Sequence, residues 1–267
     1  MPLDLDSPEV LEALKPLPPI LYHYTNAAGF FGIVESGSCL HATHHGLVND
    51  DGEISFGYDI AREVLSDLVG LAPEVREAAE AEISKLSEED SFIACLSRKR
   101  NALSQWRAYG DNGAGYCIGF GMGSTQRLDR YGDDEDFWST HVFECTYGRD
   151  AVAALLKQRF ERCINREERA EDLASVAWHY AHLAKHEHFY EECEWRFVIG
   201  APKQSVQYKV GARGLTPYLP TEKLTIEKVW IGPSVPGPRV AQRNVERFLA
   251  SCGVNASVAH WESPFRR

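Results

Sequence analysis

The chain has 267 residues, of which 44% are hydrophobic and 25% charged, a balance that is typical of globular proteins and excludes a disordered chain or a fibrous repeat. The formal net charge of -11 excludes a surface that binds nucleic acid over its whole extent, because duplex affinity comes largely from Lys and Arg neutralising phosphates. No stretch approaches the roughly 20 apolar residues of a membrane-spanning helix, and the first residues lack the order of a signal peptide, so we expect a cytoplasmic protein.

The first half of the chain predicts strands and helices in alternation. Hydrophobic periodicity and turn residues give this order: a strand from Ile20, a helix over 27–35 capped by Thr25 or Asn26, a short strand near 39–41, a polar loop over 43–51, helices over 54–71 and 73–86, a strand over 91–97, a short helix over 103–109 and a strand over 116–120. The helix over 27–35 presents Phe30, Phe31 and Val34 on one face, and Ser36-Gly37 marks its end.

The second half continues the mixture. Its predicted elements are an excursion over 121–138, a strand over 141–147, one or two helices over 151–189, strands over 194–199, 206–210 and 225–231, a helix near 240–250 and a last strand near 254–260. No linker interrupts the chain, so we expect one domain over residues 1–267, with a lead-in helix in 1–19, a core in 20–233 and a final helix and strand in 234–267.

This order of elements predicts a mixed α+β fold, because some strands are joined by helices and others by turns. The seven cysteines are scattered singly and no CxxC pair exists, which favours reduced, packed thiols over a zinc ribbon. Neither a GxGxxG turn after a strand nor a GxxxxGK[ST] loop is present, so a nucleotide would have to be held in another way.

The first strand carries a histidine beside apolar residues. Side chains alternate along a strand, so Leu21 and His23 point to one face while Tyr22 and Tyr24 point to the other. One interpretation is a buried histidine whose hydrogen bond goes to a backbone carbonyl. The other is a histidine that positions a ligand with hydroxyl groups.

The late strand carries an unusual row of charges. Period two places Glu192, Glu194 and Arg196 on one face if the strand begins that early. Burying these charges is costly unless they pair with one another or with a ligand. The alternatives are an exposed edge with an internal ion pair, or a carboxylate that stabilises a sugar cation or orients a nucleophile.

Two further groups of side chains have both a packing and a functional interpretation. Trp106 and Tyr109 lie within helical reach and either pack in the core or form a wall on which a planar ring stacks. His179, His182 and His186 fall on one helix face, but the HExxH pattern is absent, so a polar face is favoured over a metal site. The loop Asn49-Asp50-Asp51-Gly52-Glu53 lacks a calcium-loop pattern and is interpreted as a helix cap.

The ordered set of motifs resembles a known family. The set consists of Leu21-Tyr22-His23-Tyr24-Thr25, Asn49-Asp50 with Glu53, Ser97, Trp106-Arg-Ala-Tyr109, Gly115-Tyr-Cys-Ile-Gly119-Phe120, Lys185-His186, Glu192-Cys-Glu194-Trp-Arg196 and Ile231-Gly232-Pro233. It resembles the bacterial and phage proteins grouped as domain-of-unknown-function family 2971, over roughly residues 20–233. That family is similar, more remotely, to the ADP-ribosyltransferase fold, which implies a mostly antiparallel split sheet flanked by helices.

The resemblance implies a site for NAD as the substrate. It assigns His23 and Glu194 as catalytic residues, with His23 on a ribose hydroxyl and Glu194 as the acid that stabilises the ribose cation. The implied NAD-binding residues are Tyr24, Thr25, Glu192, Trp106 or Tyr109 stacked on nicotinamide, and Arg196 or Arg107 on the pyrophosphate. It implies ADP-ribose transfer to a protein or nucleic-acid acceptor, or NAD hydrolysis, in bacterial defence or conflict. The other hypotheses are a catalytically silent nucleotide-sensing or protein-binding module and, against the net charge, a nucleic-acid-processing enzyme.

Overall fold

The computed structural model describes residues 16–47, 52–123, 128–131, 138–165, 169–200, 205–211 and 214–261. The predicted lead-in helix lies outside these residues except for its last few positions, and Asn49 and Asp50 lie outside them as well. Within the described parts, no helix is both long and apolar enough to cross a membrane.

The central element is an eleven-stranded sheet in the described part of the chain. Its strands are β1 (Ile20–Thr25), β2 (His41–His44), β3 (Phe92–Ser97), β4 (Tyr116–Gly121), β5 (Leu128–Tyr131), β6 (Trp138–Glu144), β9 (Glu194–Gly200), β10 (Gln207–Gly211), β11 (Gly214–Pro220), β12 (Thr225–Ile231) and β13 (Ser257–His260). Every pair in this sheet is antiparallel except β12 with β13. A separate parallel pair joins β7 (Thr146–Tyr147) to β8 (Ala184–Lys185). The mostly antiparallel sheet, combined with helices, confirms the predicted α+β fold class.

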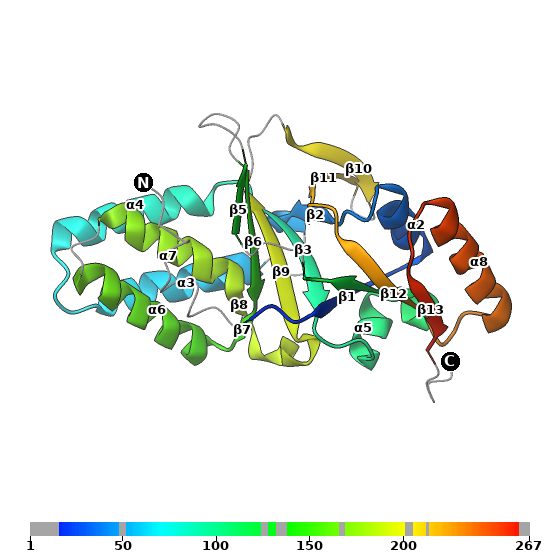
Figure 1. Cartoon of the computed structure of the whole chain (residues 1–267). Coiled ribbons are helices and arrows are strands. Elements are labelled where there is room, and N and C mark those ends of the chain that lie inside the picture. Colours follow the sequence, from blue (N-terminus) through cyan, green and yellow to red (C-terminus); the bar gives the residue numbers. More distant parts are fainter. Residues whose placement is uncertain are drawn as a thin grey trace.

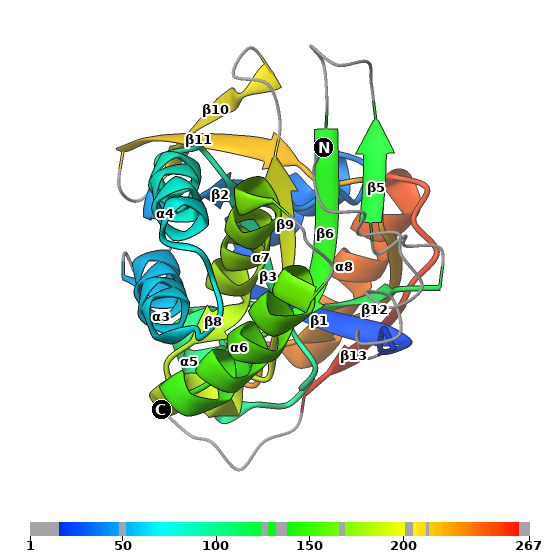
Figure 2. The ribbon, with the colours of Figure 1, turned by 90° about the vertical axis from the view of Figure 1, so that its left-hand side faces the viewer.

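Helices cover the sheet from two sides (Figures 1 and 2). The α-helices are α2 (Ala27–Glu35), α3 (Glu53–Asp67), α4 (Pro73–Ser87), α5 (Leu103–Ala108), α6 (Arg149–Asn165), α7 (Ala170–Leu183) and α8 (Pro238–Ser251). One core cluster joins α3, α4, α6 and α7 to the sheet residues Ile93, Phe143 and Val198. A second cluster joins α2 and α8 to the neighbouring positions of the same strands, such as Phe92 and Phe197. Since successive side chains of a strand point to opposite faces, both faces of β9 and of β3 are covered, except at Cys95, which is exposed.

The sheet splits along one edge of β3. The other edge of β3 pairs with β9 over the whole length of β3. On the splitting edge, β2 pairs only with Phe92 and Ile93, and β1 pairs only through Tyr22 opposite Ser97. Strands β1 and β2 therefore diverge from opposite ends of β3 and leave the edge around Cys95 uncovered by a strand.

The glycine and asparagine signals around α2 are confirmed. The Asn26 side chain accepts the Gly29 N–H and so caps the helix, and Gly37 leaves it with φ +80. Phe31 does not share the buried face with Phe30, because it is 49% exposed and stacks on Phe248. Ile33 is buried in its place.

The structure differs from the sequence prediction at the end of one helix and by one additional strand. The helix expected to reach residue 189 ends at Leu183, because Ala184 is extended and starts β8, which pairs with β7. The late strand begins at Glu194 as predicted, and Glu192 is not part of it, since Cys193 has φ +44 and breaks the extended conformation. The structure also contains β11, which the sequence did not predict. The final strand, β13, pairs with β12 at the edge of the sheet, and the final helix, α8, packs into the core beside it.

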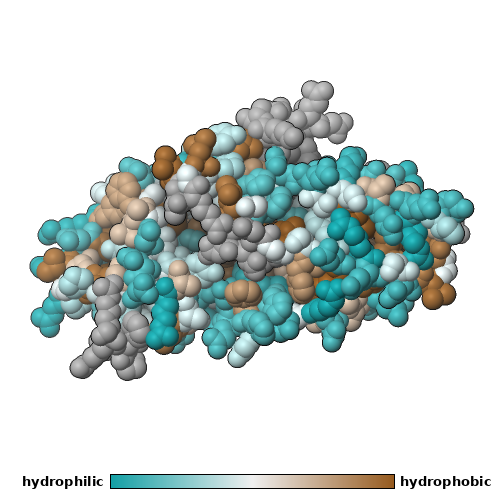
Figure 3. Space-filling view, turned by 180° about the vertical axis from the view of Figure 1, so that it is seen from behind, coloured by the Kyte–Doolittle hydropathy of each residue, from teal (hydrophilic) through white to brown (hydrophobic). Residues whose placement is uncertain are grey.

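The surface carries no broad apolar area on the face seen from behind (Figure 3). Hydrophilic side chains dominate this view, and the hydrophobic ones lie in small separate groups.

Candidate functional site

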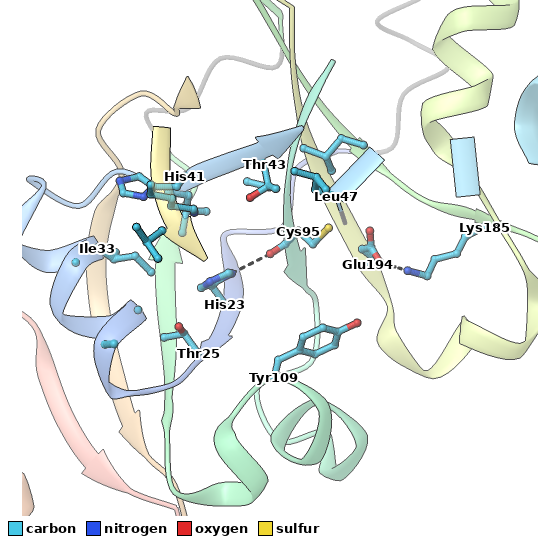
Figure 4. A pocket seen from close by; sticks show the side chains of 18 residues that line it. His23, Thr25, Ile33, His41, Thr43, Leu47, Cys95, Tyr109, Lys185 and Glu194 are labelled. Atoms are coloured by element: carbon cyan, nitrogen blue, oxygen red, sulfur yellow. Dashed lines mark hydrogen bonds and ion pairs between the residues drawn. The ribbon is translucent and has the colours of Figure 1, made fainter. Parts of the chain in front are cut away.

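A cavity of about 540 Å³ occupies the split between β1 and β2 (Figure 4). Its volume falls in the range of ligand pockets in proteins. Residues from α2, β1, β2, β3, β8, β9 and β10 line it, together with residues from three connections. The polar and charged lining residues are His23, Thr25, His41, Thr43, Cys95, Tyr109, Lys185, Glu194 and Lys209.

His23 projects from β1 into this cavity and binds the exposed edge of β3. Its Nδ1 lies 2.9 Å from the carbonyl oxygen of Cys95. A carbonyl only accepts, so Nδ1 carries the proton. Burial lowers the pKa of His23, which keeps the imidazole neutral at pH 7. Nε2 is then the hydrogen-bond acceptor, so the same ring satisfies a backbone carbonyl and still has a nitrogen to offer a hydroxyl.

The wall opposite the charged residues is made of small side chains on α2. Ala28, Gly29 and Gly32 line the cavity there. A Cβ atom at Gly29 would come within 2.0 Å of Thr25 Oγ1, so glycine is needed for this close approach. A Cβ atom at Gly32 would meet nothing within 4 Å, so its lack of a side chain leaves open space in the cavity.

Glu194 lies at the other end of the cavity in a network of buried charges. Its Oε2 pairs with Lys185 Nζ, and its Oε1 accepts from Arg196 Nε at 2.5 Å. The Tyr147 hydroxyl accepts the Glu194 N–H at 2.7 Å and fixes the start of the strand. Burial raises the pKa of Glu194, but Arg196 and then Lys185 outweigh this and lower it to about 2. The carboxylate is therefore ionised at neutral pH.

Glu192 belongs to the same network although it does not belong to the strand. Lys185 Nζ lies 2.7 Å from Glu192 Oε2, and the Tyr109 hydroxyl donates to Glu192 Oε1 at 3.1 Å. Burial and the neighbouring Glu194 raise the pKa of Glu192 against the opposing effect of Lys185. Two nearby carboxyl groups with pKa values shifted in opposite directions are a common arrangement in acid–base sites.

Only one of the two predicted aromatic residues reaches the cavity. Tyr109 lines the main cavity and a smaller adjoining one that also touches Tyr24. Trp106 is 1% exposed and packs between Tyr24 and Trp261, at 5.1 Å and 5.3 Å between ring centroids. Stacking of Trp106 on a ligand is therefore wrong as a prediction, because its faces are covered by the core.

The predicted arginines do not line the cavity either. Arg196 is fully buried, and its Nη1 donates to the backbone oxygen of His182 at 2.9 Å while Nε holds Glu194. A ligand pyrophosphate has no access to this guanidinium, so Arg196 acts through Glu194. Arg107 is exposed on α5 and lies outside the lining of the cavity.

Of the remaining predicted residues, Thr25 lines the main cavity, whereas Tyr24 holds a neighbouring segment in place. Thr25 lines the main cavity beside His23. Tyr24 points to the opposite face of β1 and lines only the smaller cavity, and its hydroxyl donates to the Lys99 carbonyl at 2.8 Å. Tyr24 thus holds the segment that follows β3.

Three residues that the structure brings into the site, Lys185, His41 and Lys209, had no predicted role. Lys185 was part of a recognised motif, yet its position between two carboxylates depends on the β7–β8 pair. His41 lines the end of the cavity away from Glu194, as Figure 4 shows, and Lys209 shares the contact of His41 with Tyr218. Their only sequence signal is strand alternation, which does not say which face meets a cavity.

The histidine stripe is not formed as predicted. His179 and His182 are buried on α7, but His186 lies beyond the end of that helix. His182 Nε2 instead makes a 2.8 Å hydrogen bond with Ser91 Oγ. Among the residues that the structure describes, no three His, Cys, Asp or Glu side chains form a group suited to a metal ion.

The fold and the site define an α+β protein with a polar cavity at a split in its sheet, lined at one end by an ionised, buried carboxylate. Residues 105–197 match the model of the family described as Protein of unknown function (DUF2971), which confirms the predicted resemblance to that family over about a third of the chain. The matched segment includes Tyr109, Lys185 and Glu194 but not His23. No curated protein and no solved structure matches the chain, so the remoter similarity to the ADP-ribosyltransferase fold stays a prediction.

Proposed function

We propose that the protein consumes NAD, either transferring ADP-ribose to a protein or nucleic-acid acceptor or hydrolysing NAD. The observation that carries the proposal is that His23 and the ionised Glu194, on strands far apart in the sequence, line one cavity. A role in bacterial defence or conflict is part of the same proposal and rests on the family resemblance alone.

The chemistry of NAD cleavage fits these two side chains. Breaking the bond between ribose and nicotinamide sends the electron pair to nicotinamide and leaves positive charge on the ribose. A carboxylate hydrogen-bonded to the ribose 2′-hydroxyl stabilises that charge in the transition state. Glu194 supplies the carboxylate, His23 Nε2 accepts a hydrogen bond from a ribose hydroxyl, and Tyr109 offers its ring to nicotinamide. Water or an acceptor group then adds to C1′ and releases a proton.

Nicotinamide release tests this proposal. Purified protein is incubated with NAD, alone and with candidate acceptors, and free nicotinamide is measured by chromatography. Glu194→Gln keeps the shape of the side chain but removes its charge, and we expect release to fall by about 100-fold or more. Glu191→Gln makes the same change at an exposed residue outside the cavity and should leave release unchanged.

A second variant protects the test against misfolding. His23→Asn leaves the carboxylate network intact and should also lower release, and the melting temperature of each variant reports whether it folds. The proposal fails if the wild-type protein neither binds NAD nor releases nicotinamide, or if Glu194→Gln behaves as wild type.

One observation favours a second candidate function. Both oxygens of Glu194 already have cationic partners, Lys185 and Arg196, as expected of a carboxylate with a structural role. The alternative is a catalytically silent module that senses a nucleotide or binds a protein through the same cavity. Calorimetry that detects NAD binding without nicotinamide release would favour this alternative.

A further inference from the structure

Lys209 on β10 lines the cavity and lies over the ring of Tyr218, on which His41 stacks. Figure 4 shows His41 at the end of the cavity away from Glu194. In the β10–β11 hairpin, Lys209 pairs with Thr216 and Gln207 pairs with Tyr218, and Tyr218 in turn pairs with Thr43 on β2. Directly opposed residues in antiparallel strands share a face of the sheet. The register therefore places Lys209, Tyr218 and Thr43 on one face, and Lys209 and Thr43 line the cavity.

The charge of Lys209 is not compensated within the described residues. Its Nζ lies 5.2 Å from the centre of the Tyr218 ring, and none of the described carboxylates forms an ion pair with it. Lys209 is half-buried, and burial lowers its pKa. Partial burial of a cation without an acidic partner is costly, and a bound anion would remove that cost.

The charges at the Glu194 end of the cavity are balanced, unlike the charge of Lys209. There, two cations, Lys185 and Arg196, are matched by two acids, Glu192 and Glu194. The network has no formal excess charge when all four groups are ionised. The uncompensated positive charge of the lining thus lies at Lys209.

His41 completes a group of donors around Lys209. Its ring stacks on Tyr218 with 4.1 Å between centroids, and Lys209 Nζ lies 5.2 Å from the centre of the same Tyr218 ring. Burial and then the charge of Lys209 lower the pKa of His41, which leaves a neutral ring with one N–H to donate at pH 7. Thr43 lies two positions from His41 on the same face of β2 and also lines the cavity. An ammonium, an imidazole N–H and a hydroxyl together offer the donors that phosphate oxygens accept.

We infer that Lys209, His41 and Thr43 form a subsite for the diphosphate of a nucleoside-diphosphate ligand whose sugar reaches His23. The inference rests on the proposed function in taking the ligand to be a dinucleotide such as NAD. It goes beyond that proposal because it assigns the anion to Lys209 of β10 with His41 and Thr43 of β2, in place of the arginines that the family resemblance implied.

Calorimetric titration with three ligands tests the subsite. ADP carries the diphosphate on a nucleoside, inorganic pyrophosphate carries the diphosphate alone, and nicotinamide riboside carries no phosphate. Lys209→Met should weaken ADP and pyrophosphate binding by at least about tenfold, because a charge-assisted hydrogen bond is lost. Binding of nicotinamide riboside should stay unchanged. Lys209→Arg, which keeps the charge, should restore most of the loss.

Lys228→Met is the matched control. Lys228 Nζ also lies over an aromatic ring, 5.0 Å from the centre of Trp230, but Lys228 does not line the cavity. This variant loses a lysine of the same kind and should bind all three ligands as wild type does.

The outcomes separate this inference from the proposed function. The subsite is refuted if wild type binds neither ADP nor pyrophosphate, or if Lys209→Met binds both normally. It is also refuted if Lys209→Met weakens the binding of nicotinamide riboside as much as the binding of ADP. ADP binding that depends on Lys209 without any nicotinamide release would support the subsite and contradict the enzyme. Nicotinamide release that is indifferent to Lys209→Met would contradict the subsite alone.

Discussion

Replacing Lys185 tests whether the carboxylate end of the cavity is held by one shared cation. Its Nζ pairs with Glu194 and lies 2.7 Å from Glu192 Oε2, and the Lys185 side chain is only 5% exposed. Lys185→Met keeps a side chain of similar length and removes the charge. Both acids then lose their common partner, although Glu194 keeps Arg196.

The expected loss of stability follows from the burial of these groups. Removing one partner of a buried ion pair costs about 3–5 kcal/mol, because the remaining charge is left uncompensated. Arg196 still neutralises Glu194, and the Glu192 side chain is 14% exposed, so we expect the lower value, about 3 kcal/mol at pH 7. With a urea m-value of about 3 kcal/mol per molar, the midpoint of unfolding should fall by about 1 M.

The pH dependence gives this prediction its sharpest form. In wild type the pKa of Glu194 is lowered from 4.5 to about 2, so its stabilisation is present above pH 4.5 and is lost as the pH falls toward 2. Without Lys185 we expect the pKa values of both acids to rise, since burial then acts with less opposition. The difference in stability between wild type and Lys185→Met should be largest at pH 7 and shrink toward pH 4.5, as the acids of the variant take up protons.

Urea unfolding at pH 7 and pH 4.5, followed by circular dichroism, measures both effects. Lys85→Met is the control, because Lys85 forms an exposed pair with Glu82 at 3.4 Å and should change stability by less than about 0.5 kcal/mol. The reasoning is refuted if Lys185→Met is as stable as wild type at pH 7, or if its deficit is the same at both pH values.

The elements that the sequence predicted well are those with strong local signals. Helix α2 begins after the Asn26 cap and ends before Gly37, and β12 matches its apolar run. These boundaries depend on residues within a few positions of them. The end of α7 depends instead on the β7–β8 pair, and the exclusion of Glu192 from β9 depends on Cys193 in a left-handed conformation. Those features come from tertiary contacts.

The candidate site shows the same division. The family resemblance linked His23 with Glu194, and the structure brings both into one cavity. The family resemblance did not decide whether Trp106 or Tyr109 stacks on the ligand, because that choice depends on the packing of Trp106 against Tyr24 and Trp261. Lys209 was not predicted at all, because its direction depends on a hairpin register and on β11.

Two further perturbations test the buried histidines and the open wall of the cavity. Burial lowers the pKa values of His23, His179 and His182, so the unfolded chain takes up protons first as the pH falls below 6.5. The free energy of unfolding of wild type, measured in urea, should therefore fall between pH 7 and pH 5, and a flat profile would contradict this. At Gly32 an added Cβ meets nothing within 4 Å, so Gly32→Ala should gain about 0.5–1 kcal/mol, the usual cost of glycine inside a helix. The Trp side chain of Gly32→Trp should fill the cavity and abolish ADP binding in calorimetry, without lowering the melting temperature. Phe31→Trp, at the neighbouring exposed position, is the control and should bind ADP normally. Normal ADP binding by a folded Gly32→Trp protein would mean that the ligand does not occupy this cavity.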